Sequence, residues 1–217
     1  MTNRNPISVV RQTGVSMIET MLVMPIMLVI GLGIIHGGLV FQAQSNLEYA
    51  ALMAARAGAA NNIDIEAMVV EAEYRMRATT GVSAENQDDI DGALGRFNIE
   101  VLNPTQGMFN DCGLPPATPG VCNGSLICQE LPFFGLQFYD HNDLRCDGAN
   151  IQDANLLRVR LTYLYDSKVP LLNNIRFIGE SSLPEAIAGT PITAVATVRM
   201  QSPARLTEFN QPYIYSD

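Results

Sequence analysis

Histidine, tryptophan and clusters of basic residues are scarce in this chain of 217 residues. There is no tryptophan, and His36 and His141 are the only histidines, too few for a histidine-rich metal centre or a conventional histidine-based triad. The 13 Lys and Arg residues are outnumbered by 22 Asp and Glu residues, so the formal net charge is −9. An acidic chain without a basic cluster lacks the electrostatic surface that nucleic acids require, and we expect no nucleic-acid partner.

Recognised enzyme motifs are absent from the sequence as well. It contains no Walker loop, no dinucleotide-binding glycine fingerprint, no HExxH and no GxSxG. We therefore expect no enzymatic activity, no cofactor and no metal.

Formal charge is missing altogether from residues 20–47, which contain no Asp, Glu, Lys or Arg. Residues 21–41 are mainly Met, Leu, Val and Ile, and a helix of that length spans ~30 Å, the thickness of a bilayer core. We predict a transmembrane segment at about residues 20–42. Because Arg4 and Arg11 precede it and no acidic residue occurs before Glu19, the positive-inside rule places the N-terminus in the cytoplasm.

A cleaved secretory signal is the alternative interpretation of this segment. Ala43-Gln44-Ser45 has the small-x-small form of a signal-peptidase site, but the apolar run is longer than the usual core of a signal peptide.

A better-placed cleavage position precedes the apolar run. Gly14 ends a short polar, basic leader, and Glu19 follows at the cytoplasmic mouth of the predicted membrane helix. A carboxylate at that place is costly in lipid unless it is paired. Cleavage after Gly14 would create a new amine on Val15, and Glu19 of a neighbouring subunit could pair with that amine in an assembly.

Residues 13–60 resemble the TadE-like pseudopilins, which are minor pilin-like subunits of the tight-adherence (Flp, type IVc) pilus machinery. The resemblance rests on Gly14 and Glu19, on Pro25 in the sequence LVMP, on the long apolar run and on the sequence AARAGA at residues 54–59. It implies cleavage by a dedicated prepilin peptidase on the cytoplasmic side and transfer of the subunit from the membrane into a pilus or its base.

Small residues recur along the same helix, which we expect to run over residues 15–60 with Pro25 loosening it. Gly33 and Gly37 form a GxxxG pair, which lets helix backbones approach closely in lipid. Two further rows repeat every four residues: Ala50, Ala54 and Gly58, and Ala51, Ala55 and Ala59. We expect these rows to pack against partner helices.

The rest of the chain predicts a small α+β domain over residues 61–217. Asn61 and Asn62 can end the first helix, and Asp64 can cap a second helix that runs to about Thr79. Helical spacing predicts that its buried face consists of Ile63, Ala67, Val70 and Tyr74. Alternation of apolar and polar residues over residues 97–101, 157–165 and 192–200 indicates three half-buried strands. A small antiparallel sheet covering the upper helix would give the α+β plan of a pilin.

A long insert, residues 103–150, separates the first two strands and contains every cysteine: Cys112, Cys122, Cys128 and Cys146. Because the insert lies outside the cytoplasm in the predicted topology, we expect disulfides. Four cysteines allow three pairings. We favour Cys112 with Cys122 and Cys128 with Cys146, since pairing nearest neighbours closes two short loops.

Two metal sites are the alternatives that the acidic and cysteine-containing segments raise. Zinc would need free thiolates, and the cysteines contain no CxxC spacing. Calcium would use Asp88, Asp89 and Asp91, but Gln87 and Asn98 stand where an EF-hand loop needs carboxylates. We therefore expect a solvated acidic loop at this place.

These features predict a leader at residues 1–14, a long helix at residues 15–60 and an outer domain at residues 61–217. The function that the resemblance implies is that of a minor pilin, anchored in the bacterial inner membrane with its C-terminal domain periplasmic or extracellular. The implied partners are other pilin-like subunits, the pilus assembly machinery, the prepilin peptidase and membrane lipid. An uncleaved single-pass membrane protein whose outer domain binds a ligand or a surface is the alternative.

Overall fold

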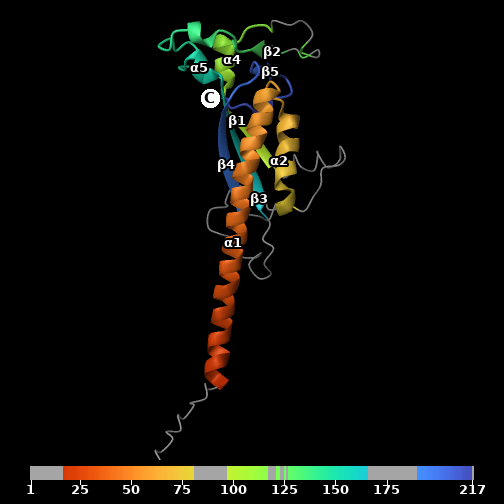
Figure 1. The fold of residues 1–217 in the computed structure, drawn as a ribbon, viewed down its shortest axis with the longest axis vertical. Helices are drawn as coiled ribbons and strands as arrows, with labels where there is room; N and C mark the ends of the chain where they lie inside the picture. The colour runs from red at the N-terminus through yellow and green to blue at the C-terminus, as the bar shows by residue number, and fades with distance from the viewer. Residues whose placement is uncertain are drawn as a thin grey trace, which may run out of the picture.

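The computed structural model describes residues 17–80, 97–116, 121, 122, 125, 127–165 and 190–216, and in them one long helix leads into a small α+β domain (Figure 1). The helices are α1 (Met17–Ala60), α2 (Ile65–Thr80), α4 (Gln106–Cys112) and α5 (Ile151–Ala154), with 3-10 turns η1 (Leu136–Phe138) and η2 (Gln211–Tyr213). The strands are β1 (Phe97–Asn103), β2 (Cys128–Glu130), β3 (Leu156–Tyr165), β4 (Thr190–Arg199) and β5 (Arg205–Thr207). The predicted fold class, a long N-terminal helix followed by a small antiparallel sheet domain, is confirmed.

The helix α1 is continuous over 44 residues, which corresponds to a length of ~66 Å. It ends at Ala60, where Asn62 adopts the left-handed backbone conformation with φ 57°. The amide of Ile63 then donates a hydrogen bond back to the carbonyl of Gly58, which satisfies one of the last carbonyls of the helix. The predicted helix end at Asn61 and Asn62 is therefore confirmed.

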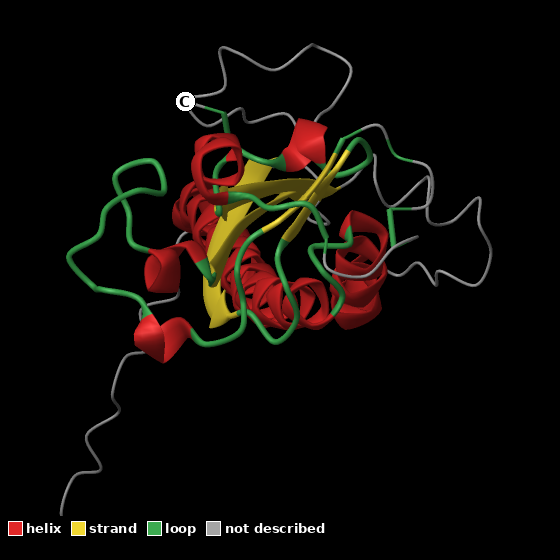
Figure 2. Cartoon of the chain, turned by 90° about the horizontal axis from the view of Figure 1, so that it is seen from above, coloured by secondary structure: helices red, strands yellow, loops and turns green. Residues whose placement is uncertain are grey.

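The main sheet has the strand order β1-β3-β4, and both pairings are antiparallel. Its strands coincide with the three alternating segments of the sequence. Both long helices lie on one face of this sheet, with α1 packed against β3 and β4 and with α2 beside α1 (Figure 2). The other face of β4 is exposed, since exposed and buried residues alternate along the strand.

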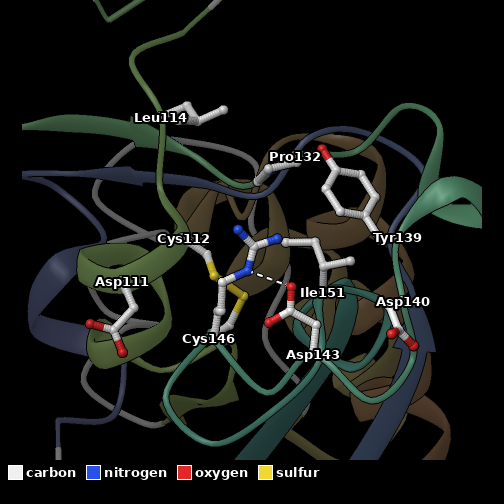
Figure 3. A pocket seen from close by; sticks show the side chains of 10 residues that line it. Asp111, Cys112, Leu114, Pro132, Tyr139, Asp140, Asp143, Cys146 and Ile151 are labelled. Atoms are coloured by element: carbon white, nitrogen blue, oxygen red, sulfur yellow. Dashed lines mark ion pairs between the residues drawn. A yellow bond between two sulfur atoms is a disulfide. The ribbon is translucent and has the colours of Figure 1, made fainter.

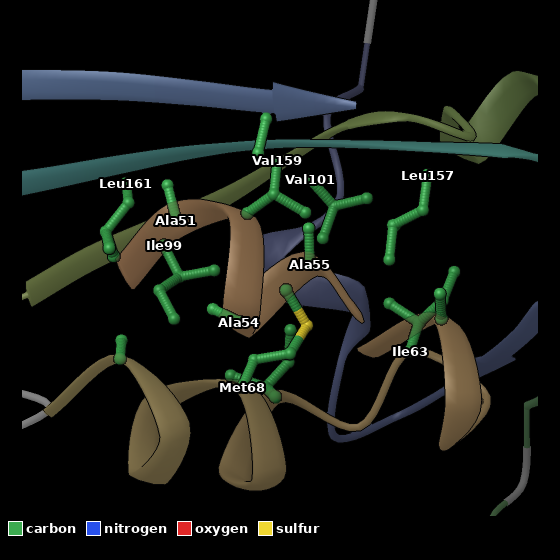
Figure 4. Close-up of a cluster of buried hydrophobic side chains, with 14 of the residues drawn as sticks. Ala51, Ala54, Ala55, Ile63, Met68, Ile99, Val101, Leu157, Val159 and Leu161 are labelled. Carbon is green, nitrogen blue, oxygen red and sulfur yellow. The ribbon is translucent and has the colours of Figure 1, made fainter. Parts of the chain in front are cut away.

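The centre of the core is the alanine-rich half of α1 (Figure 4). Ala51, Ala54 and Ala55 are fully buried between the strands on one side and Met68 of α2 on the other. Alanine side chains are short enough that α2 and the sheet both approach the α1 backbone closely. The expectation that these rows pack against partner helices is therefore wrong: Ala50, Ala54, Gly58 and their neighbours are buried inside the chain's own domain.

The buried face of α2 also differs from the prediction. Met68, Val69, Ala72 and Met76 are buried, whereas two predicted core residues, Val70 and Tyr74, are 38% and 51% exposed. The reason is that Ile63 lies before the helix, with φ 63°, so a helical spacing counted from Ile63 selects the wrong face.

The cysteine-containing insert is folded at the end of the domain that lies farthest from the start of α1 (Figure 1). Its strand β2 pairs with β5 in a second, two-stranded sheet, in which Arg205 and Glu130 form a largely buried ion pair. The four cysteines form two disulfides, Cys112–Cys146 and Cys122–Cys128. The expectation of paired cysteines is met.

The favoured pairing of nearest neighbours is wrong. Helix α4 carries Cys112 to the loop that contains Cys146, where the amide of Asp147 donates to the Asp111 carboxylate. Cys122 and Cys128 are then left to close a small loop that leads into β2.

Candidate functional site

The residues predicted to direct processing and assembly lie at the start of α1. Gly14 and Val15 lie outside the described residues. Glu19 lies in the first turn of α1 and is exposed, as are the apolar side chains that follow it. Within the described part of the chain Glu19 forms no ion pair, and the N-terminus of a helix, with its partial positive charge, is a favourable place for a carboxylate.

The side chains of α1 change from exposed to buried along its length. Large apolar side chains are exposed from Met17 to Ile35, whereas Leu39 and Val40 pack against the outer domain and Ala43 is buried. Among the described residues, α1 is the one helix long and apolar enough to cross a membrane. Its uncovered part, residues 17–38, is ~33 Å long and therefore matches a bilayer core.

The last turn of the predicted membrane segment is covered on one side only. Phe41 is 75% exposed, while the neighbouring Val40 packs against the core. The outer domain thus begins to cover α1 about one turn before the predicted end of the span at residue 42.

The glycines of the uncovered part border open space. A Cβ atom built on Gly31, Gly33, Gly37 or Gly38 would meet no atom within 4 Å. By contrast, a Cβ on Gly58 would lie 2.5 Å from the Met68 sulfur. The glycines of the apolar half of α1 are therefore uncovered within the described structure, and Gly58 is required by packing inside the domain.

Three contacts fix the outer domain to α1 at the upper end of the uncovered part and just above it. The ring of His36 lies 6.5 Å from the ring of Tyr165 at the end of β3, and burial raises the pKa of the Tyr165 hydroxyl. The Gln44 side-chain amide donates to the carbonyl of Thr193 at 2.9 Å. The Asn46 amide donates to the Thr79 hydroxyl of α2 at 2.9 Å. Both the sheet and helix α2 are thus tied to α1 at this junction.

A pocket of about 220 Å³ lies at the other end of the molecule, beside the Cys112–Cys146 disulfide (Figure 3). Asp143 and Arg145 form an ion pair of 2.6 Å at its edge, and Tyr139 and Ile151 supply apolar surface. Its two cysteines are consumed in the disulfide, and no histidine lines it. The pocket therefore offers a binding surface, but no nucleophilic side chain in its lining is in contact with a base.

Metal ligands are not gathered anywhere in the described part of the chain, since no group of three or more His, Cys, Asp or Glu residues there could hold an ion. Asp88, Asp89 and Asp91, which raised the calcium hypothesis, lie outside the described residues.

The sequence patterns did not reveal the short elements in the insert and directly after it. The signals were present as helix caps: Thr105 precedes α4 and its hydroxyl accepts from the Met108 amide, and Asn150 precedes α5 and accepts from the Asp153 amide. The pairing of β2 with β5 joins segments far apart in the chain, and three-residue strands carry no periodicity that could reveal it.

Comparison with known proteins identifies the N-terminal part of the chain. Residues 14–56 match the model of the family described as TadE-like protein. The match covers about a fifth of the chain and includes Gly14, Glu19, the apolar helix and the first alanine rows. It confirms the resemblance to TadE-like pseudopilins. No curated protein and no solved structure matches the chain.

Proposed function

We propose that the protein is a TadE-like minor pilin that takes part in the assembly of a tight-adherence pilus. The observation that carries this proposal is the TadE-like match over residues 14–56, a segment that contains both the Gly14 and Glu19 pair and the membrane-length part of α1. The fold supports the proposal, because the uncovered part of α1, residues 17–38, is an exposed apolar stalk, and the same helix farther along forms the core of the outer domain.

The role is structural rather than catalytic. The uncovered half of α1 holds the subunit in the inner membrane, with the N-terminus in the cytoplasm and the outer domain on the opposite side. After cleavage by the prepilin peptidase, residues 1–14 are removed and Val15 becomes the first residue. Glu19 then docks the subunit by pairing with the new amine of a neighbouring pilin-like subunit, while Pro25, Gly33 and Gly37 belong to the helix surface that contacts neighbouring helices.

The test is the identity of the mature N-terminus in the producing cell. Mass spectrometry of the protein purified from membranes should give Val15 as the first residue. Substitution Gly14→Phe should leave the full leader in place, because a bulky side chain at the cut site blocks processing. The matched control Val9→Phe places the same ring within the leader, away from the cut, and should be processed normally.

The alternative function makes a different prediction in the same experiment. An uncleaved single-pass protein would keep Met1, and a secretory protein cut after Ser45 would begin at Asn46. Either result, in cells with an active prepilin peptidase, would overturn the proposed function.

A further inference from the structure

Within the part of the chain that the structure describes, one edge of β4 is not paired with another strand, and neither the core nor the uncovered part of α1 explains this edge. β4 is the last strand of the main sheet and runs for ten residues, and from Thr190 to Val198 it carries no charged residue. Soluble proteins usually protect such an edge with charges, bulges or covering segments, because its unpaired backbone groups can bind another strand. A long, uncharged edge is therefore a ready template for strand addition.

The backbone groups that point to this edge can be assigned. The Met200 amide donates to the Asn155 carbonyl, so the even-numbered residues of β4 bond to β3. The Thr193 carbonyl instead accepts from the side chain of Gln44, so the odd-numbered residues face away from β3.

Three residues therefore present backbone groups to the edge. Val195, Thr197 and Arg199 direct their amides and carbonyls outward, and within the described residues these groups have no backbone partner. Pro191 is also odd-numbered and therefore faces outward. Because proline has no amide hydrogen, its presence at this position removes no hydrogen bond to β3.

Two arginines lie near the end of this edge that is farther from the predicted membrane segment, Arg199 on β4 and Arg158 on the neighbouring strand β3. Leu156 pairs with Arg199 and Arg158 pairs with Thr197, so Arg158 and Arg199 are diagonal neighbours on the exposed face of the sheet. Arg160, the next arginine along β3, is paired with Glu100 at 2.7 Å. Arg158 and Arg199 form no ion pair within the described part of the chain, so this corner is an unneutralised positive site on a strongly acidic protein.

The β4 edges of two copies of this chain do not fit each other. β4 runs in the same direction as α1, since Thr193 bonds to Gln44 near the stalk and the Gln201 amide bonds to Ala59 at the far end of α1. Antiparallel pairing of two β4 strands would point the two stalks in opposite directions, so both could not enter one membrane. Parallel pairing would place Arg199 of one copy beside Arg199 of the other, and like charges side by side oppose it.

We infer that the β4 edge binds an extended, acidic segment of another polypeptide as an added strand. The backbone groups of Val195 and Thr197 pair with it, and Arg158 and Arg199 bind its carboxylates at the end away from the membrane. This inference rests on the membrane anchoring of the proposed function only where it excludes pairing of two β4 strands. It does not depend on cleavage after Gly14, so it can fail while the proposed function stands.

The test uses the full-length protein in nanodiscs and a short capped peptide of alternating threonine and valine with aspartates near its N-terminus. Its twin carries lysines instead of the aspartates. The acidic peptide should slow hydrogen exchange at the amides of Val195 and Thr197, as followed residue by residue by NMR. The lysine twin should bind at least about fivefold more weakly, because its lysines repel Arg158 and Arg199, whereas the aspartates form exposed ion pairs with them.

Variants separate backbone pairing from charge. Substitution Thr197→Pro removes an edge-facing amide and should abolish binding, whereas Thr162→Ala, on the same exposed face of the central strand, should leave it unchanged. Replacing Arg158 and Arg199 together by alanine leaves the backbone intact and should reduce the affinity for the acidic peptide about fivefold. Protected amides at Ala194 and Ala196 show that each variant remains folded.

Several outcomes would overturn the inference. They are the absence of protection at Val195 and Thr197 with saturating acidic peptide, equal binding of the lysine twin, and peptide binding elsewhere on the domain. Protection of the same amides without peptide, together with dimer formation, would assign the edge to self-association instead.

Discussion

The backbone of Gly58 in α1 lies directly against the side chain of Met68 in α2, so close that a Cβ atom on Gly58 would lie 2.5 Å from the Met68 sulfur and 3.2 Å from a methyl group of Leu157. The flexible thioether of Met68 can move, but the leucine of β3 closes the other side of the same space. The pair therefore fixes the distance between α1, α2 and the sheet.

Enlarging Gly58 should destabilise the outer domain. We expect Gly58→Val to cost about 1–3 kcal/mol of unfolding free energy, because side chains added to a packed core force their neighbours to shift. Chemical denaturation of the full-length protein in detergent measures the change. Gly33→Val, in the same helix but with open space around it, should leave the unfolding free energy of the outer domain unchanged. Equal effects of the two substitutions would contradict this packing role.

The two disulfides should differ in their contribution to stability. Cys112–Cys146 spans 34 residues and Cys122–Cys128 spans six, so the chain-entropy model gives about 4 and about 2 kcal/mol for the two. Replacing Cys112 and Cys146 together by serine should therefore lower the unfolding free energy more than replacing Cys122 and Cys128. Non-reducing peptide mapping of the wild-type chain should recover these two pairs and no free thiol. Recovery of a Cys112–Cys122 peptide would refute the arrangement.

Regular elements could be predicted from the sequence because their periodicity is local. The apolar run of α1 and the alternation along β1, β3 and β4 each extend over many residues, so the pattern survives whatever the elements pack against. The rows of small residues, by contrast, could not be interpreted correctly from the sequence. Ala50, Ala54 and Gly58 signal close approach of another backbone, but the pattern does not say whether that backbone belongs to a neighbouring subunit or to the same chain.

Long-range contacts account for what the sequence did not reveal. The pairing of Cys112 with Cys146 depends on how α4 docks onto the loop around Asp147, and the β2–β5 sheet depends on the return of the chain near its end. In the candidate site, too, local features could be predicted and features that depend on long-range contacts could not. Glu19 and the membrane-length helix were evident from their order in the chain, whereas the edge-facing backbone of β4 required the register of the sheet.

The boundary between the uncovered stalk and the domain should coincide with the membrane surface. Ile35 and Ser45 both have exposed side chains, but the first lies within the uncovered apolar part and the second lies above it. In the proposed topology, Ser45→Cys should react with a membrane-impermeant maleimide added from outside, and Ile35→Cys should not. The native cysteines are paired and give no background. Equal labelling of both positions in intact membranes would show that α1 is not embedded as proposed.

Glu19 should be required for incorporation into the pilus rather than for folding. It is exposed in the first turn of α1, far along the helix from the buried alanines, so Glu19→Gln should leave the outer domain and its disulfides unchanged. Membrane insertion should be unharmed, because a charge has been removed next to an apolar helix. In an assembly, however, the Val15 amine of a neighbouring subunit would lose its carboxylate in a low-dielectric setting, which costs ~3–5 kcal/mol. The measurement is co-purification of the variant with the pilus machinery, compared with its level in the membrane.

Thr20→Val, at the adjacent position, is the matched control and should be incorporated normally. Normal incorporation of Glu19→Gln would show that Glu19 is a solvated residue at the headgroup level, and loss of the variant from the membrane would show a role in insertion or stability.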